Sequence, residues 1–301
     1  MQRIASIGEC MVELSPRGEG LHGLGFGGDT LNTAVYLARL GQPVDYLTAL
    51  GDDALSDRML AAWAAEGVGI EQVRRVPGRL PGLYLIETDE RGERRFHYWR
   101  DRAPARELFA GEPPDLSPYS LVYLSGISLA IYGEAGRAKL FAALDAARAR
   151  GARIAFDTNY RPRLWADAAA ARDAMEAMLA RTDIALPGLD DACAIWGEGK
   201  AAAHRARLRG LGAKEVVLKQ GPDPVLIAAA EGELAVAAEH VEKVVDSTAA
   251  GDSFNAGYLA ARLAGAAPAE AARRAHRLAA AVLGHPGAII PKAAMPAPSQ
   301  A

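Results

Sequence analysis

Short apolar runs alternate along this chain with segments of helical periodicity, and this alternation constrains the fold more than any other feature. The apolar runs lie at 4–8, 44–49, 121–125, 154–157, 184–186 and 216–219. Helical patterns occupy 30–40, 56–66, 134–150, 167–180, 201–209, 253–264 and 268–283. Strands that alternate with helices are typical of α/β domains with a mostly parallel sheet. We therefore expect a single α/β domain over residues 1–301, doubly wound and flanked by helices.

Two inserted segments, 10–26 and 80–101, break the alternation. Residues 83–88 and 95–100 flank the charged stretch 89–93, which predicts a hairpin with a solvated tip. Tyr98 and Arg100 share one face of the returning strand because side chains alternate along a strand. A small sheet that carries Tyr and Arg favours a lid over a polar ligand. An antiparallel edge of the main sheet is the alternative.

Composition excludes several classes of protein. The 301 residues carry a formal net charge of −3, which does not favour nucleic-acid binding, and no apolar stretch has the length of a membrane span. Two cysteines give no disulfide framework, so a cytoplasmic location is expected. The six histidines show no metal-ligand spacing, so no protein metal site is expected.

The segment 246–257 carries the strongest indication of chemistry. Ala249, Ala250 and Gly251 stand directly before Asp252, and a helical pattern follows. The first free amides of a helix attract anions, and an acid beside them can take a proton from a hydroxyl held near a phosphate. The segment therefore predicts a phosphoryl-transfer site, with a simple helix cap as the alternative. Because alanine disfavours positive φ, we expect the turn at 249 to have an ordinary φ.

A second polar segment, Gly27-Gly28-Asp29-Thr30-Leu31-Asn32, precedes another helical pattern. The glycines allow close backbone approach, and Asp29 and Asn32 offer short polar groups suited to a polyhydroxylated ligand. Asp29 and Thr30 as a helix N-cap are the alternative.

These two segments, about 220 residues apart, together resemble the two motifs of the ribokinase-like (PfkB) carbohydrate kinases. The resemblance extends from residue 4 to about 287. Segments 8–14, 96–100, 124–128 and 156–162 are most similar to members that act on 2-keto-3-deoxygluconate. The resemblance implies ATP-dependent phosphorylation of that sugar acid at its terminal hydroxyl. Asp252 would be the general base, and the amides of residues 249–251 would form an anion hole.

The resemblance also implies a set of binding residues. Those on the substrate side are Gly28, Asp29, Thr30, Leu31, Asn32, Tyr84, Tyr98, Arg100, Arg161 and Asp252. Those on the nucleotide side are Asn159, Tyr160, Arg161, Lys219, Gly221, Ala249, Ala250, Gly251 and His276. The implied cofactors are ATP and Mg²⁺, with dependence on a monovalent cation left open. A sugar acid requires a cationic partner, and Arg100 and Arg161 are the candidates.

The chain departs from the family pattern at several positions. Gly188 and Asp191 stand where the family has an Asn-x-x-Glu motif that organises magnesium. Pro224 replaces a glycine after the turn at 221, so the contacts of 222–225 are open. His276 lies near the adenine by family position, and a surface helix position is the alternative.

Other functions stay open at this stage. One is a kinase for another substrate: ribose, fructose, 2-keto-3-deoxygalactonate or a nucleoside. Another is an NAD-linked oxidoreductase, suggested by the G-x-G-x-x-G spacing of 23–28, although no strand directly precedes it. A third is a sugar-binding sensor without activity. The apolar outer face of the lid, with Leu83 and Leu85, indicates a homo-oligomer, and burial against the chain's own loops is the alternative.

Overall fold

The computed structural model of the protein describes residues 3–18, 20–88 and 94–297. Eight strands form the main sheet: β1 (Ile4–Ile7), β4 (Val44–Leu47), β9 (Leu121–Ser125), β10 (Arg153–Asp157), β11 (Ile184–Ala185), β12 (Glu215–Gln220), β13 (Asp223–Ala229) and β14 (Gly232–Val236). Their spatial order is β14-β13-β12-β11-β10-β9-β1-β4. The six strands from β12 to β4 run parallel, and β13 and β14 add an antiparallel edge. The predicted mostly parallel sheet is confirmed.

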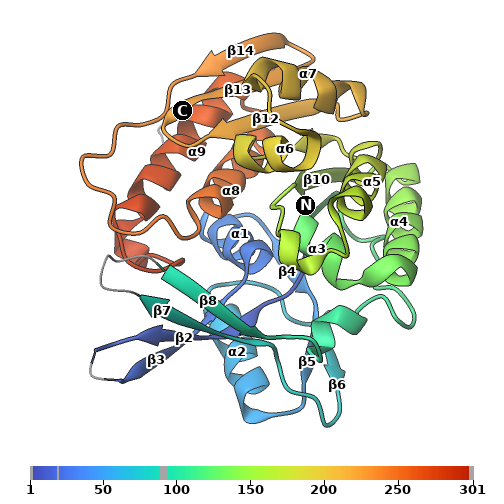
Figure 1. Cartoon of the computed structure of the whole chain (residues 1–301), viewed down its shortest axis with the longest axis vertical. Coiled ribbons are helices and arrows are strands. Elements are labelled where there is room, and N and C mark those ends of the chain that lie inside the picture. Colours follow the sequence, from blue (N-terminus) through green and yellow to red (C-terminus); the bar gives the residue numbers. More distant parts are fainter. Residues whose placement is uncertain (1–2, 19, 89–93, 298–301) are drawn as a thin grey trace.

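Helices cover both faces of this sheet (Figure 1). They are α1 (Asp29–Arg39), α2 (Ala54–Ala65), α3 (Gly126–Ile131), α4 (Gly133–Ala149), α5 (Ala168–Leu179), α6 (Leu189–Trp196), α7 (Ala201–Gly210), α8 (Ala250–Leu263) and α9 (Pro268–Leu283). Short 3₁₀ helices lie at Pro104–Glu107, Pro162–Leu164 and Lys292–Ala294. Helices α1, α8 and α9 lie on one face, and α3 to α7 lie on the other.

Alternation along the central strands explains these two layers. Ile4 and Tyr123 belong to the core under α1, α8 and α9, whereas Ile7 and Leu124 belong to the core on the opposite face. All four side chains are fully buried. Strands buried on both faces appear as continuous apolar runs, which is why the sequence revealed them.

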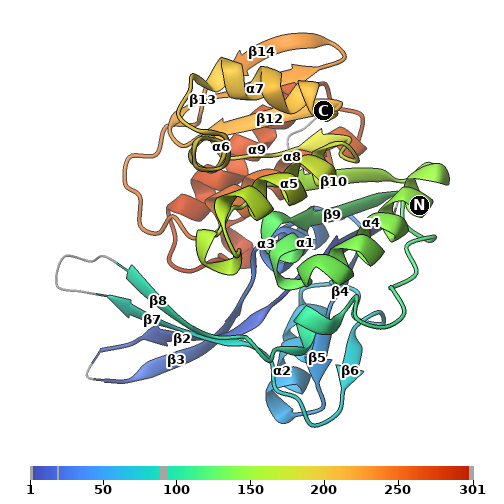
Figure 2. The same ribbon diagram turned by 45° about the vertical axis from the view of Figure 1, so that its right-hand side comes forward.

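A second sheet forms from the two inserted segments. Its strands are β2 (Met11–Pro16), β3 (His22–Gly27), β7 (Leu83–Thr88) and β8 (Arg94–Trp99), in the order β3-β2-β7-β8. Figure 2 shows this sheet extending away from the main body. Tyr84 pairs with Glu13 on one side and Tyr98 on the other, so these three side chains share one face. The predicted hairpin is present as β7 and β8, and its tip at 89–93 lies outside the described residues.

Some local predictions were wrong. The apolar run 44–49 divides between β4 and a separate short strand, β5 (Ala49–Gly51), which pairs with β6 (Arg74–Val76) in a two-stranded sheet. The hairpin of β13 and β14 was not anticipated, and Pro224 lies inside β13. Glycines 23, 25 and 27 lie on β3 itself, so they do not form the strand-to-helix turn that a dinucleotide site requires.

Candidate active site

Helix α8 begins from a turn that two hydrogen bonds fix in place. The buried Asp246 carboxylate accepts hydrogen bonds from the amide of Thr248 at 2.9 Å and from that of Gly287 at 2.8 Å. Ala249 is the N-cap and has φ 60° and ψ 14°, in the left-handed region. The expectation of an ordinary φ at 249 is therefore wrong. The tertiary hydrogen bonds of the turn impose a conformation that alanine by itself disfavours.

The first amides of α8 are free to bind a ligand. In the part of the chain that the structure describes, no backbone carbonyl accepts from the amides of Gly251 and Asp252, whereas Ala250 and Ser253 have such partners. Gly251 is exposed. These amides point from the start of a 14-residue helix, where partial positive charge favours an anion.

Asp252 lies where α8 meets the start of α1. The Asn32 Nδ2 donates to Asp252 Oδ2 at 2.8 Å, and the Thr33 hydroxyl donates to the Asp252 carbonyl at 3.2 Å. Burial and the negative charge of Asp29 raise the pKa of the Asp252 carboxyl to about 7, against the lowering effect of the Asn32 hydrogen bond. A carboxylate with a pKa near the working pH is well matched to general base catalysis.

The loop after β10 reaches the same place. Asn159 Nδ2 donates to Asp29 Oδ2 at 2.6 Å, and the Asn159 amide donates to Asp157 Oδ1 at 3.2 Å. Asn159 has φ 27°, a positive value that asparagine tolerates better than most residues. Arg161 follows on this loop with an exposed side chain that donates to the carbonyl of Tyr160 at 3.0 Å. The carboxyl end of β10 therefore joins the two helix starts.

Close backbone approach explains the glycine at position 28. A Cβ atom there would lie 2.3 Å from the Glu9 carbonyl oxygen, so a larger residue would separate α1 from the end of β1. Thr30 and Leu31 point into the core, where the Thr30 hydroxyl lies 3.1 Å from that of Tyr46. Their side chains therefore do not face the site, and only their backbone amides remain for a substrate.

The small sheet contributes aromatic rings and one buried ion pair. The rings of Tyr84 and Tyr98 lie 5.9 Å apart, and the Tyr84 hydroxyl donates to the Glu13 carboxylate. Arg100 pairs with Glu9, and both side chains are buried. Burial raises the pKa of the Glu9 carboxyl, against the lowering effect of the Arg100 charge.

The charge of Arg100 is therefore already balanced within the protein. Arg161, in contrast, forms no close ion pair among the described residues, although its charge is near enough to lower the pKa of the Asp191 carboxyl. Of the two arginines expected to hold a sugar acid, Arg161 is the exposed one whose guanidinium is not held in a close ion pair.

The residues expected on the nucleotide side lie in two different environments. Lys219, near the end of β12, donates to Asp157 Oδ2 at 2.9 Å and to Asn255 Oδ1 at 3.0 Å. Gly221 follows in an exposed turn with φ 61°. His276 packs edge-on against Phe254, with ring centroids 5.0 Å apart, and burial lowers the pKa of its imidazole. His276 is thus buried, and the alternative of a surface position is wrong.

Asp191 does not point freely into the site. Its Oδ2 accepts from the Thr158 hydroxyl at 3.0 Å and from the Tyr160 amide at 3.1 Å, so it supports the loop after β10. Burial and the nearby Asp157 raise the pKa of the Asp191 carboxyl. Among the described residues, no cluster of three or more His, Cys, Asp or Glu side chains has the arrangement of a metal site. Because Asp191 and Asp157 are both engaged by protein donors, the site fits a Mg²⁺ ion that a nucleotide and its waters would hold.

Sequence reasoning missed several members of the site. Asp157, Asn255 and Tyr123 form one network, in which Asn255 Nδ2 donates to Asp157 Oδ2 at 2.6 Å and to the Tyr123 hydroxyl at 3.1 Å. The helical spacing from Asp252 to Asn255 was the one available indication, because residues three apart share a helix face. Glu9 and Glu13 were missed because their partners lie far away in the chain.

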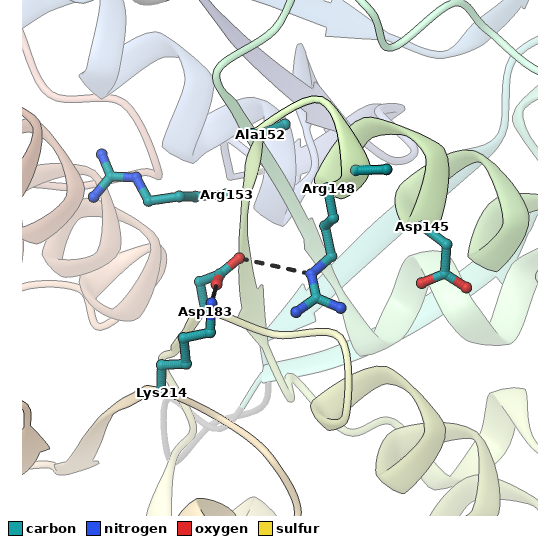
Figure 3. Close-up of a pocket in the computed structure, with 8 residues that line it drawn as sticks. Asp145, Arg148, Ala152, Arg153, Asp183 and Lys214 are labelled. Carbon is teal, nitrogen blue, oxygen red and sulfur yellow. Dashed lines mark ion pairs between the residues drawn. The ribbon is translucent and has the colours of Figure 1, made fainter.

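A separate pocket lies at the amino-terminal edge of the main sheet, away from these residues (Figure 3). It is lined by Asp145, Arg148, Ala149, Gly151, Ala152, Arg153, Asp183 and Lys214. Asp183 pairs with Lys214 at 2.8 Å and lies 4.0 Å from Arg148. The pocket lining carries three cations, Arg148, Arg153 and Lys214, and two carboxylates. The pocket lies away from the carboxyl edge of the sheet, where the sites of α/β proteins gather.

Comparison with known proteins identifies the family. A profile described as pfkB family carbohydrate kinase matches residues 1–295. This chain belongs to the pfkB family of carbohydrate kinases. The pfkB kinase is 49% identical to the 2-dehydro-3-deoxygluconokinase of Dickeya dadantii over 98% of this chain and 99% of that one. It is equally similar, at 49%, to the Escherichia coli protein of the same name, with the same shares covered.

Solved structures agree with this family. A PfkB protein from Polaromonas sp. JS666 has a TM-score of 0.85 to this kinase at 28% identity, over 96% of this chain and 98% of that chain. The predicted ribokinase-like α/β fold is confirmed. Within the part of the kinase that the structure describes, no helix combines the length and apolar character needed to cross a bilayer.

Proposed function

We propose that this kinase transfers the γ-phosphoryl group of ATP to the terminal hydroxyl of 2-keto-3-deoxygluconate, also called 2-dehydro-3-deoxygluconate. One observation carries the proposal: the Asp252 carboxylate lies beside the free amides that begin α8. Phosphoryl transfer depends on positioning and on charge stabilisation, and this place supplies a base and an anion site together. The high identity to 2-dehydro-3-deoxygluconokinases supports the choice of sugar.

In the proposed reaction Asp252 accepts the proton of the attacking hydroxyl. Asn32 holds the carboxylate in place, and Asp29 keeps its affinity for a proton high. The amides of Ala249, Ala250 and Gly251 stabilise the phosphoryl oxygens as negative charge develops on them. The Gly251 amide is free to do so without reorganisation, whereas the Ala250 amide would first have to release the Ser247 carbonyl, to which it donates at 3.3 Å.

The sugar acid would lie between α1 and the small sheet. Asp29, Asn32 and the backbone at Gly28 offer hydrogen bonds to its hydroxyl groups, and Tyr84 and Tyr98 present rings from the lid. Arg161 would bind the carboxylate of the sugar acid. Arg100 would take part in sugar binding while its charge stays paired with Glu9.

ATP would bind along the carboxyl ends of β10 and β12, near Asn159, Tyr160, Lys219 and Gly221, with His276 behind the α8 turn. Mg²⁺, bound with the nucleotide, supplies positive charge to the phosphates. Dependence on a monovalent cation belongs to the same proposal.

We further propose a single catalytic domain over 1–301, a lid made of 10–26 and 80–101, and a cytoplasmic location. A homo-oligomer through the outer lid face with Leu83 and Leu85 is also proposed. Both side chains are half-buried, and Leu83 packs partly against the core, whereas Trp99 beside Leu83 is exposed.

An ADP-release screen of the purified protein tests the function. Sugar acids, including the gluconate and galactonate epimers, are compared with ribose, fructose and nucleosides. We expect turnover with 2-keto-3-deoxygluconate, and Asp252→Asn should retain sugar binding while losing about 10²–10⁴-fold in kcat. Turnover confined to neutral sugars would favour a different specificity within the pfkB family. The pairing of Arg100 with Glu9 would then explain why this arginine does not bind a sugar carboxylate. Near wild-type turnover of Asp252→Asn would refute the assignment of the base.

A further inference from the structure

Lys219 occupies a position that three elements of the fold determine together. Its backbone amide donates to the Pro187 carbonyl at 2.9 Å, which fixes the end of β12. Its ammonium donates to Asp157 at the end of β10 and to Asn255 in α8, and only 17% of the side chain is exposed. A lysine ammonium has three donors, so one remains after these two contacts.

The ammonium also borders the first turn of α8. Within the described part of the chain, the Lys219 Nζ is what a Cβ added to Gly251 would meet, at 3.6 Å. Gly251 is exposed, and its amide has no backbone acceptor there. An anion above this turn would therefore receive hydrogen bonds from the helix amides and from the ammonium at once.

The Asp157 carboxylate, which holds the lysine, also accepts hydrogen bonds from other donors. Asp157 Oδ2 accepts from both Lys219 and the Asn255 amide, and Asp157 Oδ1 accepts from the Asn159 amide. The carboxylate is thus shared among several donors and does not depend on Lys219 alone. This arrangement leaves the ammonium able to turn its remaining donor to a ligand without leaving Asp157 unpartnered.

Building on the phosphotransferase activity proposed above, we propose that Lys219 is a catalytic residue that donates a hydrogen bond to the transferring phosphoryl group. This role is more specific than the nucleotide-side position that the resemblance implies for Lys219. In the step, the sugar hydroxyl oxygen bonds to the γ-phosphorus while the bond from phosphorus to the ADP oxygen breaks. The hydroxyl proton passes to Asp252, and Lys219 keeps all of its protons. The ammonium supplies charge where the phosphoryl oxygens gain it.

Binding of a transition-state mimic separates this role from a structural one. Isothermal titration would compare ADP alone with ADP plus aluminium fluoride, both with magnesium, for wild type and Lys219→Met. A group that acts on the transferring phosphoryl should strengthen the binding of ADP with aluminium fluoride more than the binding of ADP alone. We expect Lys219→Met to weaken aluminium fluoride binding by about 100-fold, the scale of one lost transition-state donor, and ADP binding by less than about threefold. Lys200→Met, at an exposed lysine before α7, is the matched control and should change neither.

A second variant protects the test from a folding defect. Asp157→Asn/Lys219→Met removes both charges, so no buried carboxylate is left without its cation. It should lose the preference for aluminium fluoride, whereas Asp157→Asn alone should retain most of it. Equal weakening of ADP and of the mimic, or no weakening of either, would overturn the proposal. Because no sugar is present in the titration, the result does not depend on the sugar specificity proposed above, and a failed sugar-acid screen would be a separate outcome.

Discussion

Asn32 and Asp252 lie 220 positions apart in the chain, and the Asn32 amide nitrogen lies 2.8 Å from the Asp252 carboxylate oxygen. The contact joins the first turns of α1 and α8, the two helices whose starts carry the two sequence motifs. It also brings an amide donor to a carboxylate whose pKa is raised by burial and by Asp29, and this hydrogen bond opposes the increase. The two motifs therefore meet at one place, where Asp252 is the proposed base.

This contact predicts the pH dependence of the enzyme. Asp252 must be deprotonated to accept a proton, and its pKa is raised to about 7, so kcat/KM should rise with pH through neutrality and then level off. In Asn32→Ala the loss of a hydrogen bond to the charged form should move this rise to higher pH. In Asp29→Asn the loss of a repelling charge should move it to lower pH.

Initial-rate profiles at limiting sugar would measure these shifts. Asp29 and Asn32 are both proposed to contact the sugar, so their substitution can also change the absolute rate. The variants are therefore compared by the pH at which kcat/KM rises. Shifts of the two variants in the same direction would contradict this account of Asp252.

The turn at Ala249 predicts a gain of stability on substitution. A left-handed conformation costs an L-residue about 1–2 kcal/mol, and glycine avoids this cost. Part of the gain is offset because glycine has more freedom in the unfolded chain. We expect Ala249→Gly to raise the free energy of unfolding by about 0.5–1 kcal/mol, measured by urea denaturation.

Ala264→Gly is the control for this substitution. Ala264 caps the other end of α8 with an ordinary φ of −77°, so glycine there relieves no strain and should not stabilise the protein. A loss of stability in Ala249→Gly would show that the left-handed turn is not strained.

Several features were predictable because they follow from local pattern. The parallel strands appear as apolar runs since both of their faces are buried, and the motif at 249–252 indicates a helix start by its residue order. The conformation of Ala249 was not predictable. One of the hydrogen bonds that help to fix it joins Asp246 to Gly287, which lies 41 positions further along the chain. The pairing of Arg100 with Glu9 crosses 91 positions and leaves no trace in either local sequence.

That ion pair predicts an asymmetric response to substitution. Glu9 stands between β1 and β2 and Arg100 directly follows β8, so the pair connects the entry and exit of the small sheet. Removal of one partner from a buried pair leaves an unbalanced charge and typically costs about 3–5 kcal/mol. We expect Glu9→Leu to lower the free energy of unfolding by this amount in urea denaturation.

The double variant Glu9→Leu/Arg100→Met should recover most of this loss, because it leaves no unpaired charge in the apolar surroundings. If the double variant were no more stable than Glu9→Leu, packing around position 9 would explain the loss instead.

The last prediction concerns the sugar-acid carboxylate. Arg161 is exposed and forms no close ion pair among the described residues, whereas the buried Arg100 is paired with Glu9. A hydrogen bond to a charged group contributes about 1.5–3 kcal/mol, so Arg161→Ala should raise the KM for 2-keto-3-deoxygluconate by about 10–100-fold and the KM for ATP by less. Arg163→Ala, two positions further on and also exposed, should change neither value. Equal increases in both KM values for Arg161→Ala would place this side chain on the phosphates of ATP and leave the carboxylate to Arg100.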